Sequence, residues 1–268
     1  MARHLEARSR SPCIIEFAHL ISFSMEKTVI VIPARYGSTR LSAKPLAMIH
    51  GRPMIQWVYE RAKKARGVDR VIVATDDARI EKVVREFGGD CQMTSSELLS
   101  GTDRVAAVAD QVDAEIYVNL QGDEPLMDPI AIERAVDLVR SKKFELSTVM
   151  VPLQTREELF DPSVVKVIVD SNCRAIYFSR LPIPYSRGPL PEPGQEPVCK
   201  RHVGLYVYTK SALMRFRSLP PSGLEKAEVL EQLRALENGM SMGVALADFV
   251  SIGVDTPEDL EKVRQLLV

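Results

Sequence analysis

Residues 29–45 read Val-Ile-Val-Ile-Pro-Ala-Arg-Tyr-Gly-Ser-Thr-Arg-Leu-Ser-Ala-Lys-Pro. The first four residues form a continuous β-branched run, which is typical of a strand that is covered on both faces. Similar apolar runs occur at 70–74 (Arg-Val-Ile-Val-Ala) and 116–120 (Ile-Tyr-Val-Asn-Leu). Segments with the helical spacing of apolar residues separate these runs. The sequence therefore predicts βαβ units and a largely parallel sheet, which is the α/β class.

Helices are expected at 53–66, where Pro53 suits a first turn, and at 77–87 and 102–112. After residue 146, strand-like stretches follow one another with fewer helices between them, which predicts antiparallel additions to a mixed sheet. These stretches are 146–153, 164–169, 175–178 and 203–208.

The remaining pattern predicts one long loop and two late helices. Residues 182–197 hold six prolines and two glycines, which is too broken for a helix or a central strand. Residues 224–236 have the spacing of an amphipathic helix. Thr256, as N-cap, and Pro257, in the first turn, open a last helix.

The composition limits the classes of protein to which this chain can belong. Its 268 residues, 46% of them hydrophobic, suffice for one sizeable core, so one domain is expected. Thirty-five basic and thirty-six acidic residues leave a net charge of -1, which argues against a nucleic-acid partner. The cysteines are scattered without a Cys-x-x-Cys pair, which argues against a zinc cluster or redox dithiol and favours a reduced cytosolic environment. They are Cys13, Cys91, Cys173 and Cys199.

Residues 1–24 stand outside this pattern. They are first basic and then mildly apolar, which is the order found in a secretory signal. Glu16 and His19 interrupt the apolar part, no small-residue cleavage site follows, and the stretch is too short to span a bilayer. A disordered or artefactual N-terminal extension is therefore expected at 1–24, with the domain at 25–268; an organelle-targeting segment is the alternative.

The loop after the first strand carries three cations within ten residues, namely Arg35, Arg40 and Lys44. In an open α/β sheet such a loop lies where ligands bind. The cations, with backbone amides, can neutralise a triphosphate, and arginine suits paired phosphate oxygens. A solvated basic turn is the alternative interpretation. The segment is not a Walker loop, because Gly-x-x-x-x-Gly-Lys-[Ser/Thr] is absent.

A second polar group follows the third strand, in Asn-Leu-Gln-Gly-Asp-Glu-Pro at 119–125. The carboxylate pair Asp123 and Glu124 can hold Mg²⁺ against phosphates, because Mg²⁺ prefers oxygen ligands and few protein groups, and Asp123 is the first candidate. The alternative is that Asp123 and Glu124 only cap the following turn. Asp255 completes the metal site if the fold brings it back to Asp123.

Eight blocks, in this order along the chain, closely resemble the bacterial CMP-Kdo synthetases, the 3-deoxy-manno-octulosonate cytidylyltransferases. They are IPARYGSTRLSAKPL at 32–46, VIVATDD at 71–77, SGTDRVA at 100–106, VNLQGDEP at 118–125, YFSRLPIP at 177–184, RHVGLYVY at 201–208, LEKAEVLEQLRALENG at 224–239 and GVDTPEDLEKV at 253–263. The resemblance runs from about residue 27 to the C-terminus.

The resemblance implies a nucleotide-diphospho-sugar transferase fold. This fold has a Rossmann-like mixed sheet flanked by helices, with a smaller antiparallel part for dimerisation and sugar binding. The implied activity is transfer of CMP from CTP to 3-deoxy-D-manno-octulosonate (Kdo) with release of pyrophosphate, which activates Kdo for lipopolysaccharide biosynthesis. Mg²⁺ as cofactor, a homodimer, a cytoplasmic location and independence of the membrane are implied as well.

The resemblance also implies roles for individual residues. The CTP phosphates are assigned to Arg35, Ser38, Arg40 and Lys44, and the neighbourhood of the cytosine to residues 100–104, including Ser100 and Arg104. The Mg²⁺ ligands are assigned to Asp123 and Asp255. The sugar pocket is assigned to Gln121, Arg180, His202, Tyr206, Glu231 and Gln232.

One departure from the family pattern is Ser42-Ala43, where many relatives have Pro-Gly, and it changes the backbone freedom of the cationic loop. Rival interpretations are a sibling enzyme that uses an amino-Kdo or a sialic acid, and a catalytically silent protein that binds nucleotide sugars. A Rossmann dehydrogenase is disfavoured because the first strand is not followed by Gly-x-Gly-x-x-Gly.

Overall fold

The computed structural model describes residues 26–37, 41, 43–187 and 198–267. The expected N-terminal extension at 1–24 lies outside these residues, as does most of the proline-rich segment. Nine strands of the described chain form one mixed sheet, and two more form a small hairpin. No helix in the described part is both long and apolar enough to cross a bilayer.

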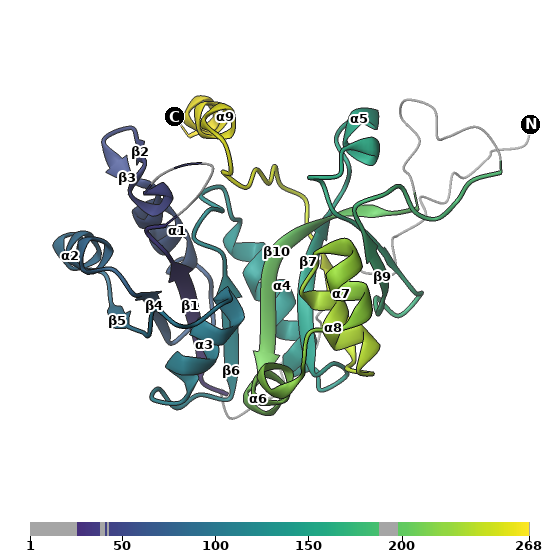
Figure 1. The fold of residues 1–268 in the computed structure, drawn as a ribbon, viewed down its shortest axis with the longest axis horizontal. Helices are drawn as coiled ribbons and strands as arrows, with labels where there is room; N and C mark the ends of the chain where they lie inside the picture. The colour runs from purple at the N-terminus through teal and green to yellow at the C-terminus, as the bar shows by residue number, and fades with distance from the viewer. Residues whose placement is uncertain (1–25, 38–40, 42, 188–197, 268) are drawn as a thin grey trace, which may run out of the picture.

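The first half of the sheet is parallel, as the apolar runs predict (Figure 1). Strand β1 lies between β4 and β6, and β5 forms the edge beyond β4. The strands are β1 (Thr28–Ala34), β4 (Arg70–Thr75), β5 (Cys91–Met93) and β6 (Ile116–Leu120). The helices between them are α1 (Met54–Ala62), α2 (Ala78–Glu86) and α3 (Gly101–Ala109), all three of which were predicted. The cationic loop leads into η1 (Lys44–Leu46) and the hairpin β2 (Met48–Ile49) and β3 (Arg52–Pro53).

The second half of the sheet adds antiparallel strands, which confirms the prediction of a mixed sheet. The long strand β10 pairs antiparallel with β6 on one side and with β7 on the other, and β11 completes that edge. β8 and β9 form an antiparallel arm on β10. The strands are β7 (Leu146–Val151), β8 (Lys166–Val169), β9 (Ala175–Ser179), β10 (Lys200–Thr209) and β11 (Met242–Leu246).

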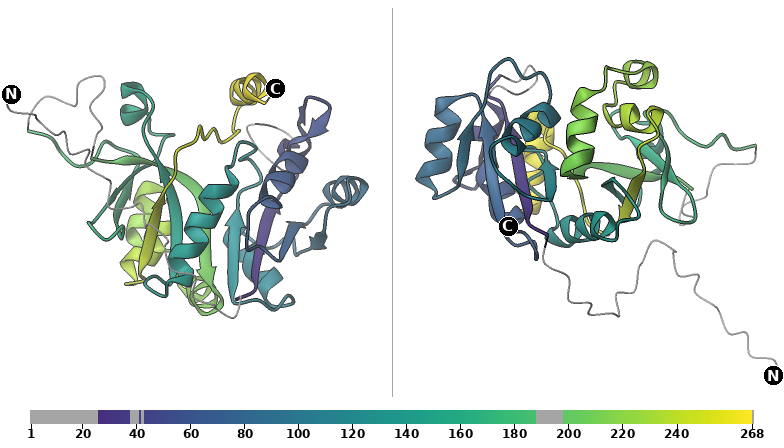
Figure 2. Two further views of the ribbon diagram at one scale, coloured as in Figure 1. Left: turned by 180° about the vertical axis from the view of Figure 1, so that it is seen from behind. Right: turned by 90° about the horizontal axis from the view of Figure 1, so that it is seen from below.

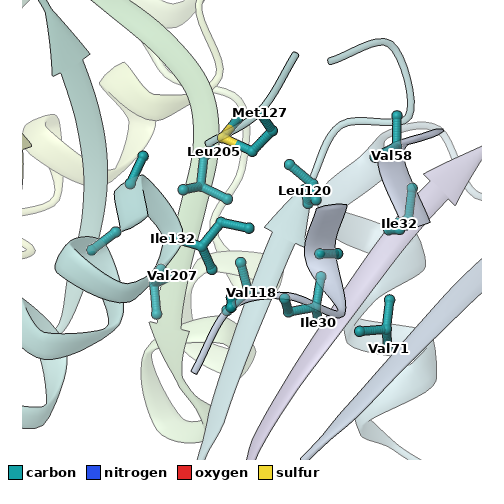
Figure 3. Packing of buried hydrophobic residues seen from close by; sticks show 14 of the residues in the cluster. Ile30, Ile32, Val58, Val71, Val118, Leu120, Met127, Ile132, Leu205 and Val207 are labelled. Atoms are coloured by element: carbon teal, nitrogen blue, oxygen red, sulfur yellow. The ribbon is translucent and has the colours of Figure 1, made fainter. Parts of the chain in front are cut away.

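Helices cover both faces of the sheet (Figure 2). Along β1, Ile30 and Ile32 face one apolar cluster with α1 and α4, whereas Val29 and Val31 face another with α3 and α6. Figure 3 shows the first of these clusters. Each fully buried aliphatic side chain contributes about 1.5–3 kcal/mol, so this alternation holds the three layers together. The helices of the second half are α4 (Pro129–Arg140), α5 (Arg156–Phe160) and α6 (Lys210–Ser218).

Helix α4 and strand β11 were not predicted. A start signal for α4 is present in the sequence, because Asp128 caps the helix through a hydrogen bond to the Ile130 amide and Pro129 occupies the first turn. Strand β11 is short; it pairs parallel with β7, and Gly243 forms an isolated antiparallel bridge with Arg174. Its existence is decided by tertiary pairing.

The single helix predicted at 224–236 is wrong. The structure has two short helices, α7 (Gly223–Glu228) and α8 (Gln232–Glu237). Between them Val229 adopts a left-handed conformation with φ of 54°. That conformation is unfavourable for a β-branched residue, so the break is imposed by contacts of the surrounding structure rather than by local preference.

The last helix, α9 (Pro257–Leu266), begins as predicted, with Thr256 and Asp259 forming a capping box. It packs on the β2–β3 hairpin, and Figure 1 shows it on the side of the first half of the sheet. The shared apolar cluster contains Ile49, Met54, Leu126, Val254, Leu260, Val263 and Leu267. The C-terminus therefore returns to the parallel strands.

Candidate active site

The loops that follow β1 and β6 meet at the carboxyl edge of the parallel strands. A Cβ added at Gly122 would lie 3.0 Å from the Pro33 carbonyl oxygen, and one added at Gly101 would lie 3.2 Å from Pro33 Cγ. The backbone is thus closely packed where β1, β6 and the start of α3 converge. Open α/β sheets bind ligands outside the carboxyl ends of their strands, so the candidate active site lies here.

Lys44 bridges the two aspartates that the sequence nominates as metal ligands. Its Nζ lies 2.6 Å from Asp123 Oδ2 and 3.1 Å from Asp255 Oδ1. The C-terminal segment reaches this point because the Val254 amide donates to the Asp123 carbonyl over 2.9 Å. Val254 itself is anchored in the apolar cluster beneath α9. The fold therefore makes the return from residue 255 to residue 123 that the metal site requires.

The charges at this bridge suit a divalent cation. Burial alone would lower the pKa of Lys44, but Asp123 and Asp255 outweigh burial and raise it, so Lys44 stays an ammonium. Among the residues described, no three or more His, Cys, Asp and Glu side chains are arranged to hold a metal. Two carboxylates converging on one cation nevertheless fit Mg²⁺, which takes few protein oxygens and shares its coordination with water and phosphates.

Glu124 ties the C-terminal segment to the loop after β6. It is only 8% exposed and accepts a hydrogen bond of 3.1 Å from Ser251 Oγ. Burial raises the pKa of Glu124 to about 7, and the Asp123 carboxylate adds to the shift, whereas Arg201 opposes it. The buried contact with Ser251 helps to hold the segment that carries Asp255.

The structure describes two of the three cations that the sequence predicts to bind phosphate, Arg35 and Lys44. Arg35 directly follows β1 and donates from Nη2 to the Leu98 carbonyl. Lys44 lies at the same edge of the sheet, in η1. Arg40 and Ser38 lie outside the described residues, so their positions stay predictions.

The block predicted to lie near the cytosine contains a half-buried residue, Ser100, and a fully buried one, Arg104. Ser100 caps α3, since its Oγ accepts from the Asp103 amide over 3.0 Å. Arg104 is fully buried, and its Nη2 lies 2.9 Å from Asp76 Oδ2. In this structure Arg104 therefore does not face a ligand, because its buried charge is balanced by a carboxylate beyond the end of β4. This ion pair ties the first turns of α3 to the segment that follows β4.

Three of the predicted sugar-binding residues form one packed group. His202 lies between Phe178 and Tyr206, with ring centroids 5.0 and 5.5 Å away, and its Nε2 is 2.9 Å from Thr148 Oγ1. Burial lowers the pKa of His202 to about 3, so the imidazole is neutral. Tyr206 donates its hydroxyl to Gln232 Oε1 over 3.1 Å. Burial also raises the pKa of Tyr206, which keeps it a neutral donor.

Gln121 and Glu231 join this group from the β6 side. Gln121 Nε2 donates to Asn119 Oδ1 over 2.9 Å, and Asn119 is the register partner of Tyr206 across the β6–β10 pair. Thr102 donates its hydroxyl to Glu231 Oε2 over 3.0 Å. Five of the six residues assigned to the sugar thus converge where β6, β10 and the α7–α8 junction meet.

Arg180, the sixth, is occupied by backbone carbonyls. Its Nε, Nη1 and Nη2 donate to the carbonyls of Glu228, Pro162 and Val229 at 2.8, 2.9 and 3.2 Å. The reason is that the end of α7 leaves carbonyls without helical partners. Arg180 therefore lies beside the α7–α8 junction, and a substrate carboxylate would compete with these carbonyls for it.

Sequence reasoning did not nominate Asn119, and it named Thr102 only as part of the stretch 100–104 near the cytosine. It considered Glu124 with Asp123 as a carboxylate pair for Mg²⁺ or as a cap, but not as a buried link to Ser251. Asn119 carries a visible signal, because it is a polar residue between Val118 and Leu120 in a strand whose five residues are all buried. Thr102 carries none, since threonine near a helix start is common.

Comparison with known proteins agrees with this geometry. The family model described as Cytidylyltransferase matches residues 29–242. The 3-deoxy-manno-octulosonate cytidylyltransferase of Syntrophotalea carbinolica is 51% identical, over 87% of this chain and 96% of its own length. The protein of the same name from Geobacter sulfurreducens is 48% identical, over 88% and 98%.

The solved structures include one of a CMP:2-keto-3-deoxy-manno-octonic acid synthetase complexed with CTP. It is 45% identical to this chain and superposes with a TM-score of 0.83, covering 90% of this chain and 98% of its own. This superposition confirms the predicted fold class.

Proposed function

This chain belongs to the family of 3-deoxy-manno-octulosonate cytidylyltransferases, and we propose that it transfers CMP from CTP to Kdo with release of pyrophosphate. The product is the activated form of Kdo for lipopolysaccharide biosynthesis. One observation carries the proposal: Asp123 and Asp255 converge on Lys44 at the sheet edge that also gathers the residues assigned to the sugar.

The reaction is attack by the anomeric hydroxyl of Kdo on the α-phosphorus of CTP. A new phosphorus–oxygen bond forms as the bond to the β-phosphate breaks, and the hydroxyl proton leaves to solvent. Such phosphoryl chemistry depends mainly on positioning and on neutralisation of charge. No protein nucleophile and no covalent intermediate is needed.

The cations of the β1 loop hold the leaving group. Arg35 and Lys44, with Arg40 from the same loop, bind the triphosphate and offset the charge that develops on pyrophosphate. Lys44 is charged in this site, since Asp123 and Asp255 raise its pKa.

We further propose that Asp123 and Asp255 hold Mg²⁺. When bound, Mg²⁺ lowers the pKa of the attacking hydroxyl and stabilises negative charge on the α-phosphate. The two aspartates reach one ammonium at 2.6 and 3.1 Å, which supports this assignment. Asp123 and Asp255 would fix the position of the cation between nucleotide and sugar.

The sugar is oriented by neutral and acidic hydrogen-bonding groups. His202 and Tyr206 are uncharged, because burial lowers the pKa of the first to about 3 and raises that of the second. They bind hydroxyls without competing for the negative substrates. Glu231 and Gln232 contribute acceptors from the α7–α8 junction, and Arg180 is the nearby cation for the sugar carboxylate.

We also propose a cytoplasmic homodimer. Both substrates are small and water-soluble, so the reaction requires no membrane. Exposed apolar side chains on and after β9 support an interface on the antiparallel part; they are Ile176 and Leu181, at 54 and 68% exposed. Sedimentation velocity of the purified chain tests the oligomeric state.

The first test of the activity is pyrophosphate release from CTP and Mg²⁺ with Kdo, 8-amino-Kdo or N-acetylneuraminate, and without sugar. Turnover with Kdo alone is expected. Turnover only with another acidic sugar would keep the reaction and change the substrate. Binding of CTP without turnover in any arm would contradict the proposal and favour a catalytically silent protein.

A further inference from the structure

A chain of four hydrogen-bonded side chains crosses the interior between the loop after β6 and the α7–α8 junction. Gln121 Nε2 donates to Asn119 Oδ1 over 2.9 Å, and Asn119 Nδ2 donates to Thr102 Oγ1 over 3.2 Å. Thr102 then donates to Glu231 Oε2 over 3.0 Å. The two central residues are 1% and 2% exposed, so they touch no ligand themselves.

The direction of this chain is set by the Glu231 carboxylate. Burial raises the pKa of Glu231, and the hydroxyls of Thr102 and Ser100, which hydrogen-bond to the carboxylate, oppose that rise. The Thr102 hydroxyl donates to Glu231 Oε2, so its single proton points to that carboxylate. The Thr102 oxygen then accepts from Asn119, which turns the amide nitrogen of Asn119 toward Thr102 and its oxygen toward Gln121.

Gln121 therefore donates from its amide nitrogen to the Asn119 oxygen, which leaves Gln121 Oε1 at the end of this chain of hydrogen bonds. Gly204 and Gly101 flank this side chain: an added Cβ would lie 3.5 Å from Gln121 Cγ at Gly204 and 3.6 Å from both amide atoms at Gly101, which are ordinary contact distances. The hydrogen bond to Asn119 selects one of the two orientations of the amide.

We propose that Thr102 and Asn119 are positioning residues that orient the Gln121 amide, so that Oε1 is presented as an acceptor for a hydroxyl of the sugar substrate. The inference rests on the proposed function, because Gln121 is assigned to the sugar there. It adds two residues that never contact the substrate and a polarity for the contact: the substrate donates and the protein accepts.

The cost of burying these groups supports a functional reason for them. A buried amide or hydroxyl is unfavourable unless it is fully hydrogen-bonded, and the neighbours of Asn119 in the strand, Val118 and Leu120, are apolar. An apolar residue would therefore serve packing at least as well. The hydroxyl of Tyr208, kept neutral because burial raises its pKa, also interacts with Thr102. Asn119 and Thr102 thus each donate one hydrogen bond and accept another, and the chain of hydrogen bonds ends at Gln121.

The test compares Thr102→Val, Thr102→Ser and wild type in the full chain. Thr102→Val keeps the shape and removes the hydroxyl, which releases the amides of Asn119 and Gln121 to flip. We expect the KM for Kdo to rise at least tenfold while the KM for CTP stays within twofold. Thr102→Ser restores the hydroxyl and should bring the KM for Kdo back to within threefold of wild type.

Thr28→Val is the matched control. Thr28 is also fully buried and hydrogen-bonded, accepting from Arg140 Nη2 over 2.9 Å, but it begins β1 at the opposite edge of the sheet. It should leave both KM values unchanged. An unchanged KM for Kdo in Thr102→Val, or equal rises in both KM values with no rescue by serine, would overturn the inference. An inactive wild type would instead overturn the proposed function itself.

Discussion

The ammonium of Lys44 lies 2.6 Å from the Oδ2 of Asp123, in the space between the two carboxylates assigned to Mg²⁺. A lysine there balances their charge before substrates arrive. On the proposed function, a divalent cation would take the place of this ammonium, and Lys44 would bind phosphate instead. Two experiments test this exchange.

Asp123→Asn should reduce turnover at least a thousandfold, because the variant loses the charge that holds a divalent cation beside the α-phosphate. The thermal midpoint should stay within a few degrees, since Asp123 is partly exposed and its backbone contact with Val254 is unaffected. Pyrophosphate release and calorimetry measure the two effects. Asp113→Asn, at an exposed ion pair with Lys210, is the control and should keep full activity. Near-normal activity of folded Asp123→Asn would refute the metal assignment.

Lys44→Met should strengthen binding of a divalent cation to the protein without nucleotide, because the competing ammonium is gone. The same variant should bind CTP at least tenfold more weakly, since a phosphate contact is lost. Mn²⁺ titration followed by electron paramagnetic resonance measures the first effect, and calorimetric titration with CTP the second. Weaker metal binding in Lys44→Met would show that the lysine does not occupy the cation position.

Arg104→Met should destabilise the fold by about 3–5 kcal/mol, because it leaves the partly buried Asp76 carboxylate without its partner. Urea unfolding gives the change in the free energy of unfolding. Arg66→Met, at an 86% exposed ion pair with Glu133, is the control and should leave the unfolding midpoint unchanged. If both variants unfold at the same urea concentration as wild type, Arg104 is not the structural cation described above.

In His202→Gln, the free energy of unfolding should fall less steeply than in wild type as the pH is lowered. The pKa of His202 is lowered to about 3 in the folded state by burial, whereas the unfolded side chain has its ordinary value near 6.5. Below about pH 6.5 the unfolded state therefore binds a proton that the folded state does not, which costs about 1.4 kcal/mol per pH unit. Urea unfolding at pH 7.5, 6 and 5 should show a smaller slope for the variant. Equal slopes for the variant and wild type would show that His202 is already protonated in the folded protein.

Val229→Gly should stabilise the protein by about 0.5–1 kcal/mol, because glycine adopts the left-handed conformation without the strain of a β-branched side chain. Val229 is 74% exposed, so little packing is lost. Val229→Ala keeps a Cβ in the same conformation and should have a much smaller effect. A lower thermal midpoint for the glycine variant would show that the break between α7 and α8 is not strained.

Much of the architecture was determined by the sequence itself, because the relevant signals are local. Continuous apolar runs placed β1, β4 and β6, and the cap Thr256 marked where the last helix begins. Arg35 directly follows β1, and Lys44 and Asp123 lie in the segments after β1 and β6, so their position near the carboxyl edge follows from the pattern.

Only the tertiary structure decided how distant groups combine, since contacts between residues far apart in the chain leave no local periodicity. The cluster beneath α9 carries Asp255 back to Asp123, and the carboxylate of Asp76 draws Arg104 below the surface. The sequence pattern predicts one helix at 224–236, but the structure breaks it at Val229, whose carbonyl accepts a hydrogen bond from Arg180. The direction of the hydrogen bonds from Glu231 to Gln121 depends on three segments, at 102, 119–121 and 231, meeting in one buried place.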